Sequence, residues 1–349
     1  MDMKRDYFED VQFLKDRTQK VWFGILLLSL ILFPFLSPNY YIYLVNYIAI
    51  NIIVTVGLNL LIGYTGQISL GHAGFFAIGA YATVLLMLKL HIPFLVAILL
   101  AGFLAAGFGF LLGLPALRLE GPYLAIATLG FGMAVTTIIG RFPFFGGHMG
   151  LQAPALTIGP WVAKTDREIY FVIITFTVLL TLAARNLTRT RIGRAFVAIR
   201  DSDIAAEALG VNIAYYKTLA FAISAFYAGV AGGLMAFVLG FINPNMFDLV
   251  LSILFLAMVV VGGPGTILGS VMGAALVSFL NIKLEAVQNI PGIGELLVTI
   301  SNKWMSISGL PNVSYILFGL ILIAIVVFER LGMYGIWLRT KIYWKTWPF

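Results

Sequence analysis

Long stretches without a charged side chain are the feature that most limits how this chain can fold. From Val21 to Leu88 there is no Asp, Glu, Lys or Arg, and of all 349 residues only 11% are charged while 61% are hydrophobic. A soluble protein carries charge on about a quarter of its residues. Apolar runs of about 20 residues can cross a bilayer as helices. We therefore expect an all-α, polytopic membrane protein.

Ten stretches free of Asp, Glu, Lys and Arg are predicted to span the membrane, and because several are short the count is eight to ten. The last two before the C-terminal region are joined by Gly263-Pro264-Gly265, so they form either two compressed spans or a re-entrant pair. The ten stretches are Val21–Leu36, Ile42–Ile62, Gly71–Leu88, Pro93–Leu114, Tyr123–Gly140, Ile169–Ala184, Leu219–Gly240, Leu249–Gly262, Ile267–Asn281 and Tyr315–Phe328.

The distribution of basic residues predicts the orientation. With the N-terminus inside, the inner segments hold 16 of the 22 Lys and Arg residues and the outer segments hold 6. Inner loops of membrane proteins are enriched in Lys and Arg, so both termini are predicted to be cytoplasmic. Residues 1–20 would form a cytoplasmic arm, 21–335 the transmembrane domain, and 336–349 a basic and aromatic tail at the inner headgroups. Topology also explains the net charge of +7 without a nucleic-acid partner.

A polar, glycine-rich segment interrupts the apolar sequence between Leu58 and Ala82. At membrane depth an unpaired polar group costs several kcal/mol, so such a segment faces protein or a water-filled cavity. Broken apolar segments of this kind point to a transport path. Tight helix packing is the alternative, and His72 would then hydrogen-bond a neighbouring helix. The residues predicted to line the path are Tyr64, Thr65, Gly66, Gln67, Ser69, His72 and Gly74.

A second glycine-rich break runs from Gly262 to Gly269 and also starts a span in the inside-to-outside sense. Its resemblance to the first break suggests internal pseudo-symmetry with the path between the two breaks. Gly263 and Gly265 are therefore added to the predicted path. The predicted span Leu219–Gly240 contains Gly229, Gly232 and Gly233, which predict close contact with another helix.

The longest predicted inner loop, residues 185–217, carries two helix patterns. The first, within Arg189–Arg200, places apolar residues on one face and arginines off it, as in a helix at the membrane surface. The second, Ile204–Leu209, follows the capping candidates Asp201, Ser202 and Asp203 and ends at Gly210. Isolated helices shorter than about 12 residues are marginal in water, so this one requires a docking partner, unless the loop is a simple connector.

Several kinds of chemistry are missing. The sequence has no phosphate-binding G-x-x-x-x-G-K-[ST] loop, no cysteine, and three histidines without metal-ligand spacing, so we expect no metal or cofactor. Ser69 and His72 are spaced to share a helix face, but no acid accompanies them, which argues against a hydrolase. No Asp or Glu lies within a span, which disfavours an ion-coupled carrier.

Five segments resemble the membrane permease subunits of ABC importers for branched-chain amino acids. They are LNLLIGYTGQISLGHAGFFAIGAYA (58–82), RLEGPYLAIATLGFGMAVTT (118–137), GGHMGL (146–151), AAEALGVN (205–212) and VVGGPGTILG (260–269), and the resemblance extends from Ile42 to Gly335. In that family a short helix in the inner loop docks on the ATPase. The resemblance assigns this role to Ala205, Ala206, Glu207 and Gly210, within a coupling loop that includes Asp201, Ser202 and Asp203.

The resemblance implies a permease for leucine, isoleucine and valine in a bacterial or archaeal cytoplasmic membrane. It implies a second homologous permease, two cytoplasmic ATP-binding subunits and an extracytoplasmic substrate-binding protein as partners, so ATP hydrolysis would occur on other chains. Close relatives transport urea or short-chain amides, which the residues alone do not exclude. The alternative of a different class is an autonomous secondary carrier or channel.

Overall fold

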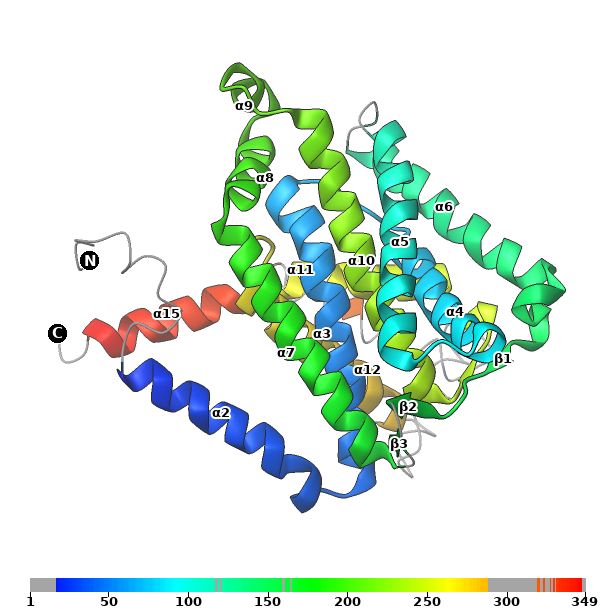
Figure 1. Cartoon of the computed structure of the whole chain (residues 1–349). Helices are drawn as coiled ribbons and strands as arrows, with labels where there is room; N and C mark the ends of the chain where they lie inside the picture. The colour runs from blue at the N-terminus through cyan, green and yellow to red at the C-terminus, as the bar shows by residue number, and fades with distance from the viewer. Residues whose placement is uncertain are drawn as a thin grey trace, which may run out of the picture.

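The computed structural model is a bundle of helices (Figure 1). It describes residues 17–116, 119, 121–158, 161–163, 165–287 and 331–346, with single positions 319, 320, 323, 327 and 329. The predicted arm up to residue 16 and most of the predicted span Tyr315–Phe328 lie outside the described residues. The helices are α2 (Arg17–Leu36), α3 (Asn39–Thr65), α4 (His72–Leu90), α5 (Phe94–Ala116), α6 (Pro122–Arg141), α7 (Asp166–Arg189), α8 (Arg191–Asp201), α9 (Asp203–Ala208), α10 (Ile213–Leu239), α11 (Leu249–Gly262), α12 (Ile267–Val287) and α15 (Gly332–Thr346).

The lengths of these helices confirm the predicted fold class. Within the described residues, seven helical segments are long and apolar enough to cross a membrane, and two shorter apolar helices cover Gly24–Leu36 and Ile267–Lys283. These nine correspond to the first nine predicted spans. Charge-free runs identified them because a helix facing lipid must be apolar along its whole length.

Helix α10 lies in the middle of the bundle and packs against α3, α4 and α5. Glycines bring α4 and α10 into contact: a Cβ at Gly79 would overlap the backbone of Gly229, and one at Gly232 would overlap the carbonyl of Phe76. A Cβ at Gly233 would overlap the side-chain hydroxyl of Thr83. The close packing predicted for Gly229, Gly232 and Gly233 is confirmed, because only the absence of side chains lets the backbones approach this far.

The two ends of the bundle differ in structure (Figure 1). Helices α8 and α9 project at one end, and short strands with three 3-10 turns form the other. Strand β1 (Leu151–Gln152) pairs antiparallel with β4 (Phe241–Ile242), and β2 (Leu156–Ile158) pairs with β3 (Trp161–Ala163). The turns are η1 (Pro143–Phe145), η2 (Gly147–Met149) and η3 (Pro244–Met246). The sequence did not predict these strands, since two or three residues are too few to show a period of two.

Candidate functional site

The first glycine-rich segment forms an extended link between α3 and α4. Gly66 has φ +73°, and its N–H and that of Gln67 bond to the carbonyls of Ile62 and Leu61, which ends α3. The chain then alternates: Gly66 and Ile68 are exposed, whereas Gln67 and Ser69 are buried. Extended backbone inside a membrane protein requires cover by protein or a water-filled cavity. Here buried side chains on one face anchor the link to neighbouring helices.

His72 is the centre of that anchoring. Its Nδ1 lies 3.0 Å from Ser69 Oγ, its Nε2 lies 2.7 Å from Ser224 Oγ of α10, and all three side chains are buried. A hydroxyl can donate or accept, so a neutral imidazole satisfies both bonds. Ser69 precedes α4, so the expectation that it shares a helix face with His72 is wrong, although the two side chains do meet. The geometry is that of a link between helices.

Two further hydrogen bonds hold the start of α4. The N–H of Leu70 donates to Thr128 Oγ1 of α6 at 3.0 Å, and the N–H of Ala73 donates to Ser252 Oγ of α11 at 3.0 Å. These N–H groups are at a helix start, where no intrahelical carbonyl is available to accept them. The break is therefore the point at which α4, α6, α10 and α11 are joined.

The remaining predicted path residues of this segment differ in their surroundings. Gln67 is 5% exposed, and neither its Oε1 nor its Nε2 is hydrogen-bonded to a described residue. Thr65 is buried, Tyr64 is partly buried, and a Cβ at Gly74 would come within 2.8 Å of Gly132 Cα on α6. Whether these residues line a path stays a prediction, because the structure places most of them inside the packing.

The second glycine-rich segment lies against the end of α3, and a path between the two breaks stays a prediction. Gly263 and Gly265 have φ +108° and +80°, and they turn the chain between α11 and α12. A Cβ at Gly63 would overlap Asn59 Oδ1 and the N atom of Gly265. There is no room for a Cβ at Gly63, so α3 and this turn pack closely against each other. We call this contact the glycine junction (Gly63–Gly66 and Gly263–Gly265).

Asn59 of α3 ties the glycine junction together. Its Oδ1 accepts from the N–H of Gly265 at 2.9 Å, and its Nδ2 donates to the carbonyl of Thr266 at 2.9 Å and to Ser270 Oγ at 2.7 Å. Asn59 has 0% exposure. Sequence analysis did not select it, because nothing in the local pattern shows that an asparagine in an apolar helix meets a turn more than 200 residues later.

Arg200 connects the inner loop to this junction. Its Nη1 donates to the carbonyl of Gly63 at 3.0 Å, while its Nε and Nη2 donate to Asp201 Oδ1 at 3.0 and 2.9 Å. Its side chain also lies against Gly66 and Gly265. The carbonyl it meets is in the last turn of α3, where the helix dipole favours a cation. Arg200 was counted as one of several loop arginines in the sequence, and only the fold distinguishes it.

The two helix patterns of the inner loop are confirmed as α8 and α9. The apolar face of α8 is buried at Ala195, Phe196 and Ile199 against the bundle. The Ser202 hydroxyl caps α9 by accepting from the N–H of Ala205 at 3.2 Å, and Gly210 has φ +82° directly after it.

Helix α9 is held to the rest of the chain at few points. Ala206 is buried, and Asp203 pairs with Lys217 of α10. By contrast, Ile204 and Leu209 are 84% and 83% exposed, and Glu207 is also exposed. Exposed isoleucine and leucine on a six-residue helix outside the bundle are typical of a protein-binding surface.

A cavity of about 320 Å³ opens between the starts of α4 and α11 and the middle of α6. It touches the first glycine-rich segment through Leu70 and contains one carboxylate, that of Asp248. We call it the Asp248 cavity; its lining is Leu70, Ala73, Leu129, Gly132, Met133, Thr136, Thr137, Phe247, Asp248, Leu249 and Ser252.

The position of Asp248 corrects one expectation. The sequence places it outside the span Leu249–Gly262 and finds no carboxylate near the middle of the membrane. In the structure α11 begins beside Ala73 and beside the middle of α6, so Asp248 lies at the level of membrane-spanning residues. The pattern of charge-free runs could not reveal this, because it does not show at which depth a helix begins.

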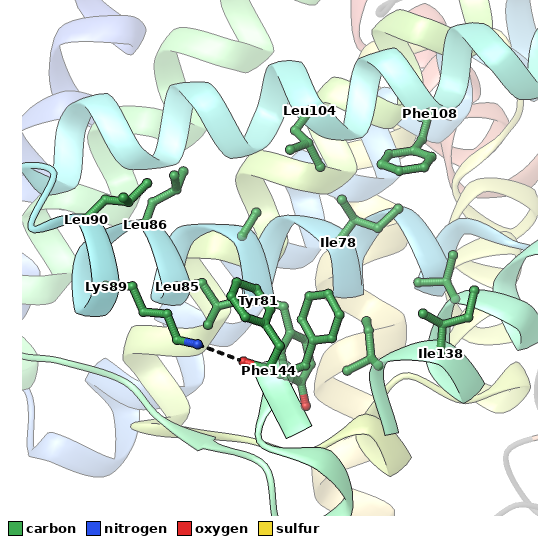
Figure 2. A pocket seen from close by; sticks show the side chains of 14 residues that line it. Ile78, Tyr81, Leu85, Leu86, Lys89, Leu90, Leu104, Phe108, Ile138 and Phe144 are labelled. Atoms are coloured by element: carbon green, nitrogen blue, oxygen red, sulfur yellow. Dashed lines mark hydrogen bonds between the residues drawn. The ribbon is translucent and has the colours of Figure 1, made fainter. Parts of the chain in front are cut away.

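A larger cavity, about 590 Å³, lies between α4, α5, α6 and η1. Figure 2 shows Lys89 reaching the carbonyl of Phe144, 3.4 Å away, while Leu104 and Phe108 of α5 point into the cavity from another wall. The rest of the lining is apolar except for Tyr81. Such a surface suits hydrocarbon better than a charged solute. Among the described residues, no three His, Cys, Asp or Glu side chains lie close enough to hold a metal ion.

A family model and a relative found by sequence comparison are both described as branched-chain amino acid transport permeases. Residues 40–326 match the family model described as "Branched-chain amino acid transport system / permease component". The "High-affinity branched-chain amino acid transport system permease protein LivM" of Escherichia coli (strain K12) is 36% identical over 283 residues, which cover 74% of this chain and 67% of that protein.

More distant relatives also match. A "Probable branched-chain amino acid transport permease protein LivM" of Methanocaldococcus jannaschii is 26% identical over 68% of this chain and 67% of its own. The "Ribose import permease protein RbsC" of Haemophilus influenzae is 27% identical over 75% of this chain and 82% of its own. No solved structure matches the chain.

Proposed function

Because the chain belongs to the family of permease components of branched-chain amino acid transport systems, we propose that it forms part of the membrane path for leucine, isoleucine and valine in an ATP-binding cassette importer. The observation that carries this proposal is the family match over residues 40–326, which runs from the start of α3 past α12. The relative in Escherichia coli is described as a permease protein of a high-affinity branched-chain amino acid transport system. The family is one of transport permeases, so this chain would act as a membrane transport subunit, with ATP hydrolysis on other chains.

Energy for transport would come from separate ATPases that bind at α9. The segment from Asp201 to Gly210 contains the capped helix α9 outside the bundle and exposes two large apolar side chains, Ile204 and Leu209. A groove beside it is lined by Glu207, Gly210 and the first residues of α10. An apolar patch on a short helix matches helix-in-groove binding, in which a few spaced side chains enter a complementary cleft. Glu207 and Gly210 would be at the contact.

Movement of α9 would reach the membrane through α8. Helix α9 is joined to α8 by Ser202 alone, and α8 ends at Arg200 and Asp201. Arg200 then holds the carbonyl of Gly63 in the glycine junction. Hydrogen bonds from a charged donor are stronger than those between neutral groups. A displacement of the inner loop would therefore act on α3 and on the α11–α12 turn at once, and the surrounding spans would move as rigid bodies.

The arrangement of the ends supports the proposed orientation. The arginine-rich α8, the glycine junction and α9 lie at one end, and the strands lie at the other (Figure 1). With Lys and Arg concentrated inside, the α9 end faces the cytoplasm and the strand end, including Gly146 to Leu151, faces outward. A substrate-binding protein would meet the strand end. A homologous second permease would complete the path.

Reconstitution tests the proposal. The chain, its second permease, the two ATPases and the binding protein are placed in proteoliposomes, and uptake of radiolabelled leucine and of urea is measured with and without ATP. We expect leucine uptake that requires ATP and the binding protein. Uptake of urea instead of leucine would replace the substrate assignment. Uptake by this chain alone, driven by an ion gradient and indifferent to ATP, would overturn the importer assignment in favour of a carrier.

A further inference from the structure

The Asp248 cavity lies part-way along α6, a helix long and apolar enough to cross a membrane. Its wall on α6 runs from Leu129 to Thr137, the middle of a helix that extends from Pro122 to Arg141. Both α4 and α11 begin at this cavity, so two helices start part-way along the neighbouring α6. In many transporters, helices that begin or break inside the membrane form the substrate site.

Asp248, Thr136 and Thr137 give this cavity hydrogen-bond acceptors, and Ser252 adds a hydroxyl that already accepts the N–H of Ala73. The hydroxyl of Thr136 donates to the carbonyl of Met133 at 3.0 Å, and that of Thr137 donates to the same carbonyl at 2.7 Å. Each hydroxyl has one hydrogen, so both oxygens keep lone pairs for a donor from the cavity. Asp248 Oδ1 accepts the N–H of Leu251 at 3.0 Å, which fixes the carboxylate while Oδ2 keeps its lone pairs.

Asp248 has no cationic partner within the part of the chain that the structure describes. It forms no ion pair with any described residue, and no Lys, Arg or His lines the cavity. A carboxylate at membrane depth is costly unless it faces water, a cation or a substrate, and such residues mark transport pathways. The cavity therefore provides one negative charge and two neutral acceptors for a ligand with several N–H donors.

The other walls of the cavity are apolar. Leu70, Leu129 and Met133 face it together with Phe247 and Leu249. Its volume, about 320 Å³, is at the lower end of the roughly 300–1,000 Å³ of small-molecule sites. A small solute with a primary ammonium group and a branched hydrocarbon chain has the matching chemistry.

We propose that the Asp248 cavity binds the α-ammonium group of the transported amino acid, with Asp248 as its counter-ion, Thr136 and Thr137 as acceptors, and the leucine and methionine walls around the hydrocarbon side chain. This inference rests on the proposed function. It excludes the larger cavity of Figure 2, which has no acceptor-rich patch and already holds a cation, Lys89, at one end. Asp248 is thus a specificity-determining residue that requires a positive charge on the substrate.

The chain contains no cysteine, which permits a direct test in the assembled importer. Met133→Cys places one thiol in the cavity wall without altering Asp248 or the threonines. The rate of maleimide labelling of this chain is measured against leucine, 3-methylbutylamine (leucine without its carboxylate) and 4-methylpentanoate (leucine without its amino group). Asp248→Asn is the test variant, since asparagine caps a helix as well as aspartate does and removes only the charge. Asp166→Asn, in the first turn of α7, is the matched control.

We expect leucine and 3-methylbutylamine to slow labelling, and 4-methylpentanoate to have no effect. In Asp248→Asn the leucine concentration for half-protection should rise at least tenfold, about 1.4 kcal/mol, while Asp166→Asn leaves it unchanged. Equal protection by 4-methylpentanoate, unchanged half-protection in Asp248→Asn, or no protection at all would overturn the proposal. ATP-driven leucine uptake by the unmodified importer is measured in parallel. If leucine is taken up normally but does not protect the thiol from maleimide, the proposed binding site alone is refuted. If leucine is not taken up at all, the proposed function is refuted.

Discussion

Replacing Asn59 by alanine removes three hydrogen bonds that hold α3 to α12 and to the turn before it. The side chain is fully buried, so water does not replace the lost partners, and the N–H of Gly265 is left without its acceptor. Hydrogen bonds between membrane helices contribute about 0.6 kcal/mol each on average. The three together predict a loss of about 2 kcal/mol in the free energy of unfolding, or roughly a twenty- to thirtyfold shift in the equilibrium.

Asn51 provides a matched control on the same helix. It is also buried and also faces α12, but it donates a single hydrogen bond, from Nδ2 to Ser278 Oγ at 2.9 Å. Asn51→Ala creates a similar void, so the difference between the two variants isolates the hydrogen bonds. We expect Asn51→Ala to cost about 0.6 kcal/mol, a two- to threefold shift.

The assay is equilibrium unfolding of the purified permease pair by titration with SDS in mixed micelles, followed by tryptophan fluorescence. The two variants should differ by about tenfold in the unfolding equilibrium, with Asn59→Ala the less stable. If Asn51→Ala were as destabilising as Asn59→Ala, or more so, the reasoning that the glycine junction depends on Asn59 would be refuted.

Three further predictions concern coupling and packing. Arg200→Ala releases the Gly63 carbonyl and should lower the number of leucine molecules taken up per ATP hydrolysed severalfold, whereas the control Arg191→Ala should not. If this ratio of uptake to hydrolysis is unchanged in reconstituted vesicles, Arg200 is not part of the coupling route. Weaker co-purification of the ATPases is expected for four variants in and next to α9: Ile204→Asp, Leu209→Asp, Glu207→Ala and Gly210→Pro. Gly210→Pro acts through the backbone, because proline cannot adopt the φ of +82° at Gly210. Normal co-purification and uptake in all four variants would make α9 a simple connector. Ser224→Ala should destabilise the permease by about 1–3 kcal/mol in the SDS titration, because it leaves His72 Nε2 unpaired. The control Ser29→Ala, at an exposed position of α2, should have little effect. Equal stability of the two variants would contradict a linking role for His72.

Local chemistry made much of the fold predictable. Charge-free runs located the nine apolar helices α2 to α7 and α10 to α12, because lipid excludes charge from a spanning segment. Ser202 and Gly210 marked the start and end of α9, since capping depends on residues within one turn. The glycines of α10 indicated close helix contact for an equally local reason, the absence of a side chain.

The site depends on distant partners, which the sequence pattern does not show. Arg200 meets Gly63, and Asn59 meets Gly265, across more than a hundred residues. Residue types alone selected Gln67, Ser69 and His72 as polar groups at membrane depth, but their burial and the bonds to α10 follow from the path of the extended link. Asp248 was misplaced for a similar reason: its depth is set by where α11 begins against α4 and α6, not by its neighbours in the chain.

Whether this chain works as one subunit of an ATP-driven importer can be tested by purifying it from its native membrane in mild detergent. Proteins that co-purify with the chain are identified by mass spectrometry. We expect a second, homologous permease and P-loop ATPases in the same particle. Recovery of the chain alone, as a monomer or homo-oligomer, would refute the importer assignment and leave α9 without a partner.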